Sequence, residues 1–157
     1  MKALHVVPSL GLLASSGSDK VVRLWRGSLL GLELCGFTHV LVCRDLSSVD
    51  DGQPLKSVGV LTEHTRPVEA LDTRVLSESV AVLYTADTMG IIRVWDITKE
   101  DVDASSPWKV KLVGELKHHR TRVDDMIHGD GHLWTGWICL RSCCLALAHV
   151  LMSSVDR

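Results

Sequence analysis

The chain has 157 residues, 46% of them hydrophobic, which is enough to bury the core of one domain and untypical of a disordered protein. Its 17 basic and 19 acidic residues give a formal net charge of -2, which excludes the strong positive field that non-specific nucleic-acid or membrane binding needs. The five cysteines form no regular framework, so we expect an intracellular protein, cytoplasmic or nuclear, with reduced and mostly buried thiols.

The first 25 residues predict three β-strands. A turn at Pro8-Ser9 separates an N-terminal strand from an apolar strand at Leu12–Ser15. A secretory signal peptide is the alternative, but a histidine and a proline interrupt the apolar run that such a signal requires. A polar turn at Gly17–Lys20 then leads into a third strand, VVRLW, which ends at Trp25.

Residues 26–54 fit the pattern of their neighbours poorly and are interpreted as an insertion. Their centre, LLGLELCGFTHVLVC at residues 29–43, leaves two interpretations open: a further pair of strands, or sequence foreign to the fold. A polar loop at residues 46–54 follows. We expect Lys56–Leu61 to return as the outer strand of the first sheet.

Residues 61–97, LTEHTRPVEALDTRVLSESVAVLYTADTMGIIRVWDI, form the most complete unit of the chain. His64 lies near its start, two short apolar runs follow, and the run IIRVWD ends at Trp95-Asp96. IIRVW has the pattern of VVRLW, with two β-branched residues first and Trp last. Gly90 falls in the preceding turn, where a positive φ is often required. Val110–Leu116 is expected to be the outer strand of this unit.

A third unit begins like the second. LKHHRTRVDDM at residues 116–126 aligns with LTEHTRPVEAL at residues 61–71, so that His119 matches His64 and Val123 matches Val68. The pair Asp130-Gly131 predicts a tight turn before the strand HLWT.

The third unit loses its pattern after residue 136. WICLRSCCLALAHVLMSSVDR has neither the expected turn nor a second Trp at a strand end, so residues 137–157 are interpreted as a non-repeat apolar tail. Its apolar run is too short to span a bilayer. A short buried helix is one interpretation of the tail, and an aberrant terminus from a truncated or alternatively processed message is the other, which the lost register favours.

These units resemble the WD repeat, the four-stranded blade of a β-propeller. The resemblance covers residues 1–136 with a gap at 26–54. It implies an all-β fold: a partial β-propeller of about two four-stranded blades plus part of a third. Trp25 and Trp95 are 70 residues apart, whereas one WD repeat spans roughly 40–45, which agrees with an insertion between them. Because each blade needs neighbours on both faces, uncovered blades and self-association are expected.

The resemblance also implies a hydrogen-bonded set in each blade, made by a His, a Ser or Thr, an Asp in a tight turn and the Trp at the strand end. The structural repeat positions are then Asp19, Trp25, His64, Trp95, Asp96 and His119. Counting back from Trp95 places Met89 at the turn position, with Asp87 two residues earlier, and the first unit has Arg26 where the family has Asp. We expect His64 to be a buried structural histidine without a catalytic role.

Residues 118–132, HHRTRVDDMIHGDGH, hold four His and three Asp. A metal-assisted hydrolase that uses this cluster is an alternative function. However, the spacing matches no ligand set such as H-E-x-x-H, and the adjacent Asp124 and Asp125 would point to opposite faces of a strand. The cysteines Cys139, Cys143 and Cys144 form no C-x-x-C pair. We therefore predict no metal, no cofactor and no enzymatic activity.

The resemblance implies a non-catalytic scaffold that binds other proteins, as in ubiquitin, chromatin or RNA-processing complexes. The loops that enter the inner strands would lie on one rim of the propeller. The residues expected on this rim are Thr65, Arg66, Arg120 and Arg122, with Lys20 and Met89 nearby. Arginine is favoured in binding surfaces, although ordinary surface charge is the alternative interpretation. A truncated product with no independent function is a third hypothesis.

Overall fold

The computed structural model describes residues 1–7, 10–26, 32–34, 41–43, 56–100, 108–138 and 145–150. These residues form thirteen β-strands and no α-helix, so the expected all-β fold class is confirmed. None of the described segments forms a helix that is long and apolar enough to cross a bilayer.

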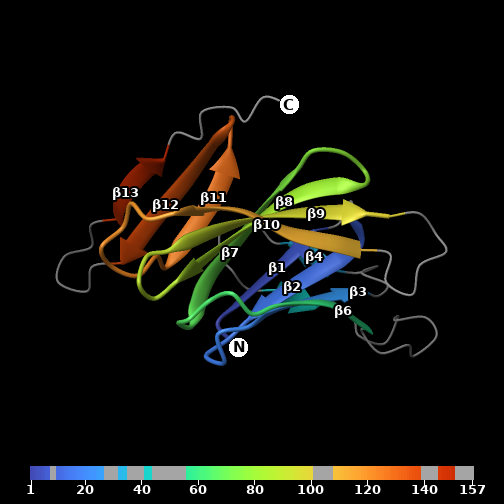
Figure 1. Ribbon diagram of the computed structural model, residues 1–157. Coiled ribbons are helices and arrows are strands. Elements are labelled where there is room, and N and C mark those ends of the chain that lie inside the picture. Colours follow the sequence, from blue (N-terminus) through green and yellow to red (C-terminus); the bar gives the residue numbers. More distant parts are fainter. Residues whose placement is uncertain are drawn as a thin grey trace.

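The strands pair antiparallel in three main sheets (Figure 1). The first sheet has the order β1 (Ala3–Val7), β2 (Leu12–Ser16), β3 (Val22–Arg26), β6 (Lys56–Leu61). The middle sheet has the order β10 (Trp108–Leu116), β9 (Ile92–Lys99), β8 (Val80–Asp87), β7 (Val68–Val75). The third sheet has the order β11 (Asp125–Gly129), β12 (His132–Ile138), β13 (Leu145–Val150). The two expected outer strands, β6 and β10, are thus confirmed as edge strands, and β10 begins two residues before the predicted start.

The insertion contains a short strand pair within its described residues. β4 (Leu32–Leu34) pairs antiparallel with β5 (Leu41–Cys43). Of the two interpretations of this region, the structure therefore agrees with the further pair of strands. The polar loop expected at residues 46–54 lies outside the described residues.

The helix considered for the C-terminal tail is a wrong prediction. Leu145–Val150 forms β13, which pairs antiparallel with β12 from Leu133↔Val150 to Ile138↔Leu145. An edge strand such as β12 presents unpaired N–H and C=O groups, and an apolar run can satisfy them by pairing in the ladder. The third sheet consequently continues past residue 136. Cys139, Cys143 and Cys144 lie outside the described residues.

The middle sheet packs against a neighbour on each face (Figure 1). Between it and the first sheet lies a buried cluster that includes Leu12, Leu24, Leu83, Trp95 and Ile97. Between it and the third sheet lies a second cluster that includes Tyr84, Ile92, Val123, Met126 and Leu133. Strands covered on both faces have few exposed positions, which explains the nearly continuous apolar run of β8 and the buried residues on both faces of β9.

The strands β1, β7 and β11 meet at Asp72, a buried residue of β7. One oxygen of its carboxylate accepts a hydrogen bond from the backbone N–H of His128 on β11, and the other lies 3.7 Å from Nε2 of His5 on β1. The same His5 nitrogen lies 2.9 Å from the Thr73 hydroxyl. Burial raises the pKa of Asp72 to about 6, and the negative charge of Asp125 also raises it. One ionisable group therefore links all three sheets.

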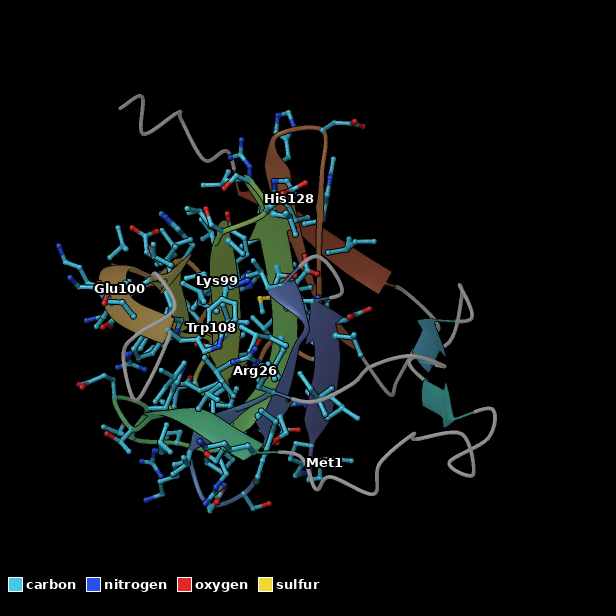
Figure 2. All side chains as sticks on the ribbon, turned by 90° about the vertical axis from the view of Figure 1, so that its right-hand side faces the viewer. Met1, Arg26, Lys99, Glu100, Trp108 and His128 are labelled. Atoms are coloured by element: carbon cyan, nitrogen blue, oxygen red, sulfur yellow. The ribbon has the colours of Figure 1, made fainter. Side chains whose placement is uncertain are left out.

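Side chains fill the space between the first and middle sheets (Figure 2). Trp108, labelled in that view, starts β10 opposite Lys99 and is only 7% exposed.

The third sheet, at the other end of the molecule, has exposed apolar side chains. Ile127 and Trp134 are register partners on β11 and β12, with 63% and 36% of their surface exposed.

Candidate functional site: a loop rim above a buried polar network

A buried polar network ties the middle sheet together beneath its loops. The Trp95 indole N–H donates to the Thr85 hydroxyl at 2.9 Å, and the same hydroxyl lies 2.6 Å from Nε2 of His64. Nδ1 of His64 lies 3.2 Å from the Asp87 carboxylate and 2.8 Å from the Arg93 guanidinium. All five residues are buried. Each therefore replaces lost hydration with a polar neighbour, as buried polar groups require.

Asp87 has a second role in this network because its other oxygen closes the turn between β8 and β9. Oδ1 accepts hydrogen bonds from the backbone N–H groups of Met89 at 2.9 Å and Ile91 at 3.1 Å. The turn has Gly90 at φ 78°, where a glycine avoids steric strain. The carboxylate that completes the set is thus Asp87, two residues before Met89, the position that counting back from Trp95 indicates.

The charges of the network are paired inside the sheet. Arg93 lies 3.7 Å from Asp87 and 3.5 Å from Glu115, so two carboxylates offset its charge. Burial lowers the pKa of His64; Asp87 opposes this effect, and the positive charge of Arg93 lowers the pKa further. The imidazole is therefore neutral at pH 7, which suits a structural group with no exposed surface on its side chain.

The first sheet contains only part of this network. The Trp25 indole N–H donates to the Ser15 hydroxyl at 2.8 Å, in the same register as Trp95 and Thr85. Asp19, the predicted turn residue, is exposed and pairs with Arg23, whose guanidinium holds the pKa of Asp19 below its ordinary value. Asp19 thus closes a surface ion pair and takes no part in a buried set.

The third sheet repeats the histidine contact. Nε2 of His119 lies 2.6 Å from the Thr135 hydroxyl, as His64 does from Thr85, and Thr135 is buried. The ring of His119 also makes an edge contact with Trp137 at 6.4 Å between centroids. Burial lowers the pKa of His119. The last predicted structural position, Asp96, follows Trp95 on β9 and points to the opposite face of the strand, away from the network.

The network supports a rim of loops at one end of the sheets. The backbone N–H of Thr88, in the β8–β9 turn, donates to the Pro67 carbonyl of the β6–β7 loop at 3.0 Å. A Cβ atom added to Gly90 would lie 2.3 Å from the Thr121 carbonyl oxygen, so the β10–β11 loop packs directly on the same turn. The Ser16 hydroxyl, just before the β2–β3 turn, donates to the Val68 carbonyl at 3.0 Å.

This rim carries exposed positive charge. Its exposed residues include all four predicted rim residues and two neighbours: Thr65, Arg66, Arg120, Arg122, Lys20 and Met89. Arg122 forms an ion pair with Asp124 at 2.8 Å. The structure gives Arg66 and Arg120 no ion pair among the residues that it describes. These two guanidinium groups are therefore available to an external carboxylate.

The His/Asp cluster of residues 118–132 is dispersed over the third sheet. His119 contacts Thr135, the His128 ring stacks on Tyr84 at 6.2 Å, and His132 lies 2.7 Å from the Asp130 carbonyl. Within the described residues, no group of three His, Cys, Asp or Glu side chains has the arrangement of a metal site. Asp130 and Gly131 form the predicted tight turn, with φ of 51° and 76°.

Thr85, Asp87 and Arg93 belong to the network but were not predicted as site residues. For Thr85, a signal was present in the sequence. Thr85 precedes Trp95 by ten residues, as Ser15 precedes Trp25, and this shared interval marks the hydroxyl partner of the indole. No model of a known protein family matches the chain, and no curated protein matches it either. The function is therefore inferred from the residues of the chain and their geometry.

Proposed function

We propose that this chain is part of a non-catalytic, WD-repeat type scaffold that binds an acidic segment of a partner protein on its loop rim. The three main sheets correspond in this proposal to two blades of a β-propeller and part of a third. The observation that carries it is the repeated contact between a Trp of the third strand, or a loop His, and a Ser or Thr hydroxyl. It recurs at Trp25–Ser15, Trp95–Thr85 and His119–Thr135.

The rim supports the binding part of the proposal through rigidity and charge. Backbone contacts hold the β6–β7 loop, the β8–β9 turn and the β10–β11 loop together, so the backbone that carries the exposed arginines is held in place. A preorganised surface loses less conformational entropy when it binds a partner. Arginine pairs with carboxylates through two parallel hydrogen bonds, which favours an acidic partner.

The third sheet supports the propeller part of the proposal. Ile127 and Trp134 form an exposed apolar pair on the face of this sheet that points away from the middle sheet. Propellers usually have 4–8 blades, each covered by the next. In this proposal, the exposed face is where a further blade would pack.

Charge reversal on the rim tests the proposed function. The double variant Arg66→Glu with Arg120→Glu should lose the acidic partners that the unchanged chain retains from a cell extract at low salt. Raising the salt should release the same partners from the unchanged chain, because screening weakens exposed ion pairs. Bound proteins would be quantified by mass spectrometry.

The matched control is Lys99→Glu with Lys111→Glu, which makes the same charge change on exposed positions of β9 and β10, outside the rim. The control should keep the partners. Loss of the same partners from both variants would show that overall charge, and not the rim, selects them, and this result would contradict the proposal.

A further inference from the structure

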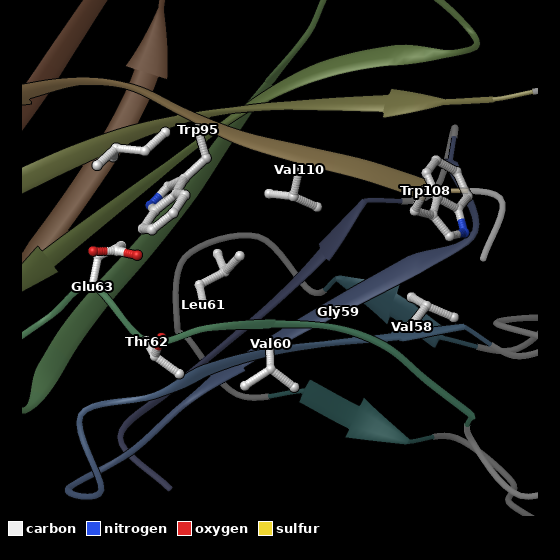
Figure 3. Close-up of a pocket in the computed structure, with 10 residues that line it drawn as sticks. Val58, Gly59, Val60, Leu61, Thr62, Glu63, Trp95, Trp108 and Val110 are labelled. Atoms are coloured by element: carbon white, nitrogen blue, oxygen red, sulfur yellow. The ribbon is translucent and has the colours of Figure 1, made fainter.

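A second surface lies between β6 and β10, the outer strands of the first and middle sheets. It is an open groove of about 360 Å³ (Figure 3). Trp95 lies at one end of the groove, Trp108 at the other, and Val110 between them. Ligand sites in proteins are typically roughly 300–1,000 Å³, so the groove is large enough for a few side chains.

The groove follows the backbone of β6. Six consecutive residues, from Val58 to Glu63, line it, so the last part of β6 and the start of the following loop contribute. β6 is the last strand of its sheet, and Val60 has 54% of its surface exposed. Edge strands present N–H and C=O groups that an added strand can pair with. This geometry fits an extended peptide.

Trp108 gives the groove a polar group at one end. Its side chain is nearly buried, with 7% of the residue exposed, and the indole N–H has no hydrogen-bond acceptor within the described part of the chain. A buried donor without a partner is costly, so an acceptor that reaches it contributes more to binding than one that must displace water. The backbone carbonyl of an extended peptide is such an acceptor.

Glu63 gives the opposite end of the groove a negative charge. It follows β6, is exposed, and lies beside the Trp95 end of the groove. The remaining lining is apolar or uncharged, apart from this carboxylate: Val58, Gly59, Val60, Leu61, Thr62, Trp95, Trp108, Val110 and Leu112. A basic side chain near Glu63 and apolar side chains along the groove would complement this surface.

We propose that an extended peptide segment with alternating apolar residues and one basic residue binds here as an added strand along β6. Its apolar side chains lie over Val110 between the two indoles, its basic side chain pairs with Glu63, and one of its carbonyls accepts the Trp108 indole N–H. Antiparallel pairing is the commoner arrangement and would place the basic residue at the amino end of the peptide. This surface adjoins the loop rim, because Glu63 lies in the β6–β7 loop, but its binding does not depend on what the rim binds.

The probe is an acetylated, amidated heptapeptide that alternates threonine with valine or leucine and carries one lysine at its amino end. It is titrated into the full-length, ¹⁵N-labelled chain and followed by NMR. The chain has five Trp, and the Trp108 indole signal is assigned by its loss in Trp108→Phe. We expect the indole signal of Trp108 and the amide signals of residues 59–62 to shift together along one binding curve.

Variants of both partners locate the contacts. Removing the indole donor with Trp108→Phe should weaken binding about two- to tenfold, the range of a single hydrogen bond. Glu63→Lys should weaken it about fivefold or more, because attraction becomes repulsion, while Glu78→Lys on the exposed β7–β8 loop leaves it unchanged. A peptide of the reversed sequence, with lysine at its carboxyl end, should bind more weakly.

Three results would overturn the proposal. The first is the absence of shifts at residues 59–62 at millimolar peptide. The second is equal weakening by Glu63→Lys and Glu78→Lys, which would indicate non-specific charge. The third is a concentration-dependent shift of the same amides without peptide, which would show that a second copy of this chain occupies the edge of β6.

Discussion

The first and middle sheets share a strand pattern but differ in the polar side chains that connect their strands and turns. In both, a Trp of the third strand donates its indole N–H to a hydroxyl ten residues earlier, Ser15 in one sheet and Thr85 in the other. In the middle sheet the hydroxyl continues to His64 and Asp87, and the set is buried. At the position equivalent to Asp87 by strand register the first sheet has Gly17.

The difference shows what the carboxylate adds. Asp87 connects the core to the turn, because its two oxygens serve the buried His64 on one side and two backbone N–H groups on the other. In the first sheet Asp19 pairs with Arg23 at the surface. An exposed ion pair contributes roughly 0–1 kcal/mol, whereas breaking a buried one costs several times more. The middle sheet should therefore dominate the stability of the chain.

The largest expected effect is at Trp95. Trp95→Ala should lower the free energy of unfolding by about 3–5 kcal/mol, because it removes a buried aromatic ring between two sheets. His132→Ala, beside the Asp130-Gly131 turn, should cost less than about 1 kcal/mol. Urea denaturation of both variants measures the difference. Equal losses would contradict the assignment of Trp95 to the core of the middle sheet.

The hydroxyl groups give a direct comparison of the two networks. Thr85→Val leaves the Trp95 indole and the His64 ring without their shared partner, and should cost about 1–3 kcal/mol. Ser15→Ala leaves one half-buried indole without its partner and should cost about 0.5–1.5 kcal/mol. Thermal or urea unfolding of the two variants measures which of them loses more stability. If Ser15→Ala were the more harmful change, the middle network would not be the stronger one.

Substitution of Asp72 should have a smaller effect on the free energy of unfolding. This effect is stabilising and depends on pH. Its pKa in the folded chain is about 6, above the ordinary value of 3.8, so between these values the folded chain binds the proton more tightly than the unfolded chain. The contribution of this group to stability is therefore favourable at low pH and is lost as the pH rises through about 6. Asp72→Asn should raise the free energy of unfolding by about 1–2 kcal/mol at pH 7, because it removes a buried charge.

The same substitution should have little effect near pH 4, where the unfolded chain also begins to bind the proton. Three histidines that are buried or partly buried have the opposite effect on the pH dependence of stability. Burial lowers the pKa of His64, His119 and His128, so they contribute stability above about 6.5 that is lost as the pH falls. Comparing unfolding of Asp72→Asn and the unchanged chain at both pH values isolates Asp72. A lower stability of Asp72→Asn at pH 7 would contradict the expected sign.

Strands were easier to predict from the sequence than the polar network. The apolar runs that end in Trp, the outer strands β6 and β10 and the Asp130-Gly131 turn all follow from local residue preferences. His64 was correctly expected to be buried. Asp87 was not assigned to the network because spacing along the chain does not determine which carboxylate reaches a histidine on another loop. That depends on the turn, which Asp87 itself closes.

Asp72 and β13 show two other limits of sequence reasoning. Asp72 has an unremarkable place in an alternating strand, and only the approach of β1 and β11 gives it two contacts from other sheets. The run that forms β13 lacks the repeat pattern, so its register gave no signal. Its pairing depends on the free edge of β12, which is a property of the folded sheet.

We infer that the middle sheet, covered on both faces and closed by the His64 network, is the stable part that holds the loop rim in place. Residue-resolved amide hydrogen exchange of the full chain at pH 7 measures the stability of each sheet separately. We expect the slowest exchange in β8 and β9, faster exchange in β2 and β3, and the fastest of the three in β11. Exchange in β8 and β9 that is no slower than in the other strands would contradict it.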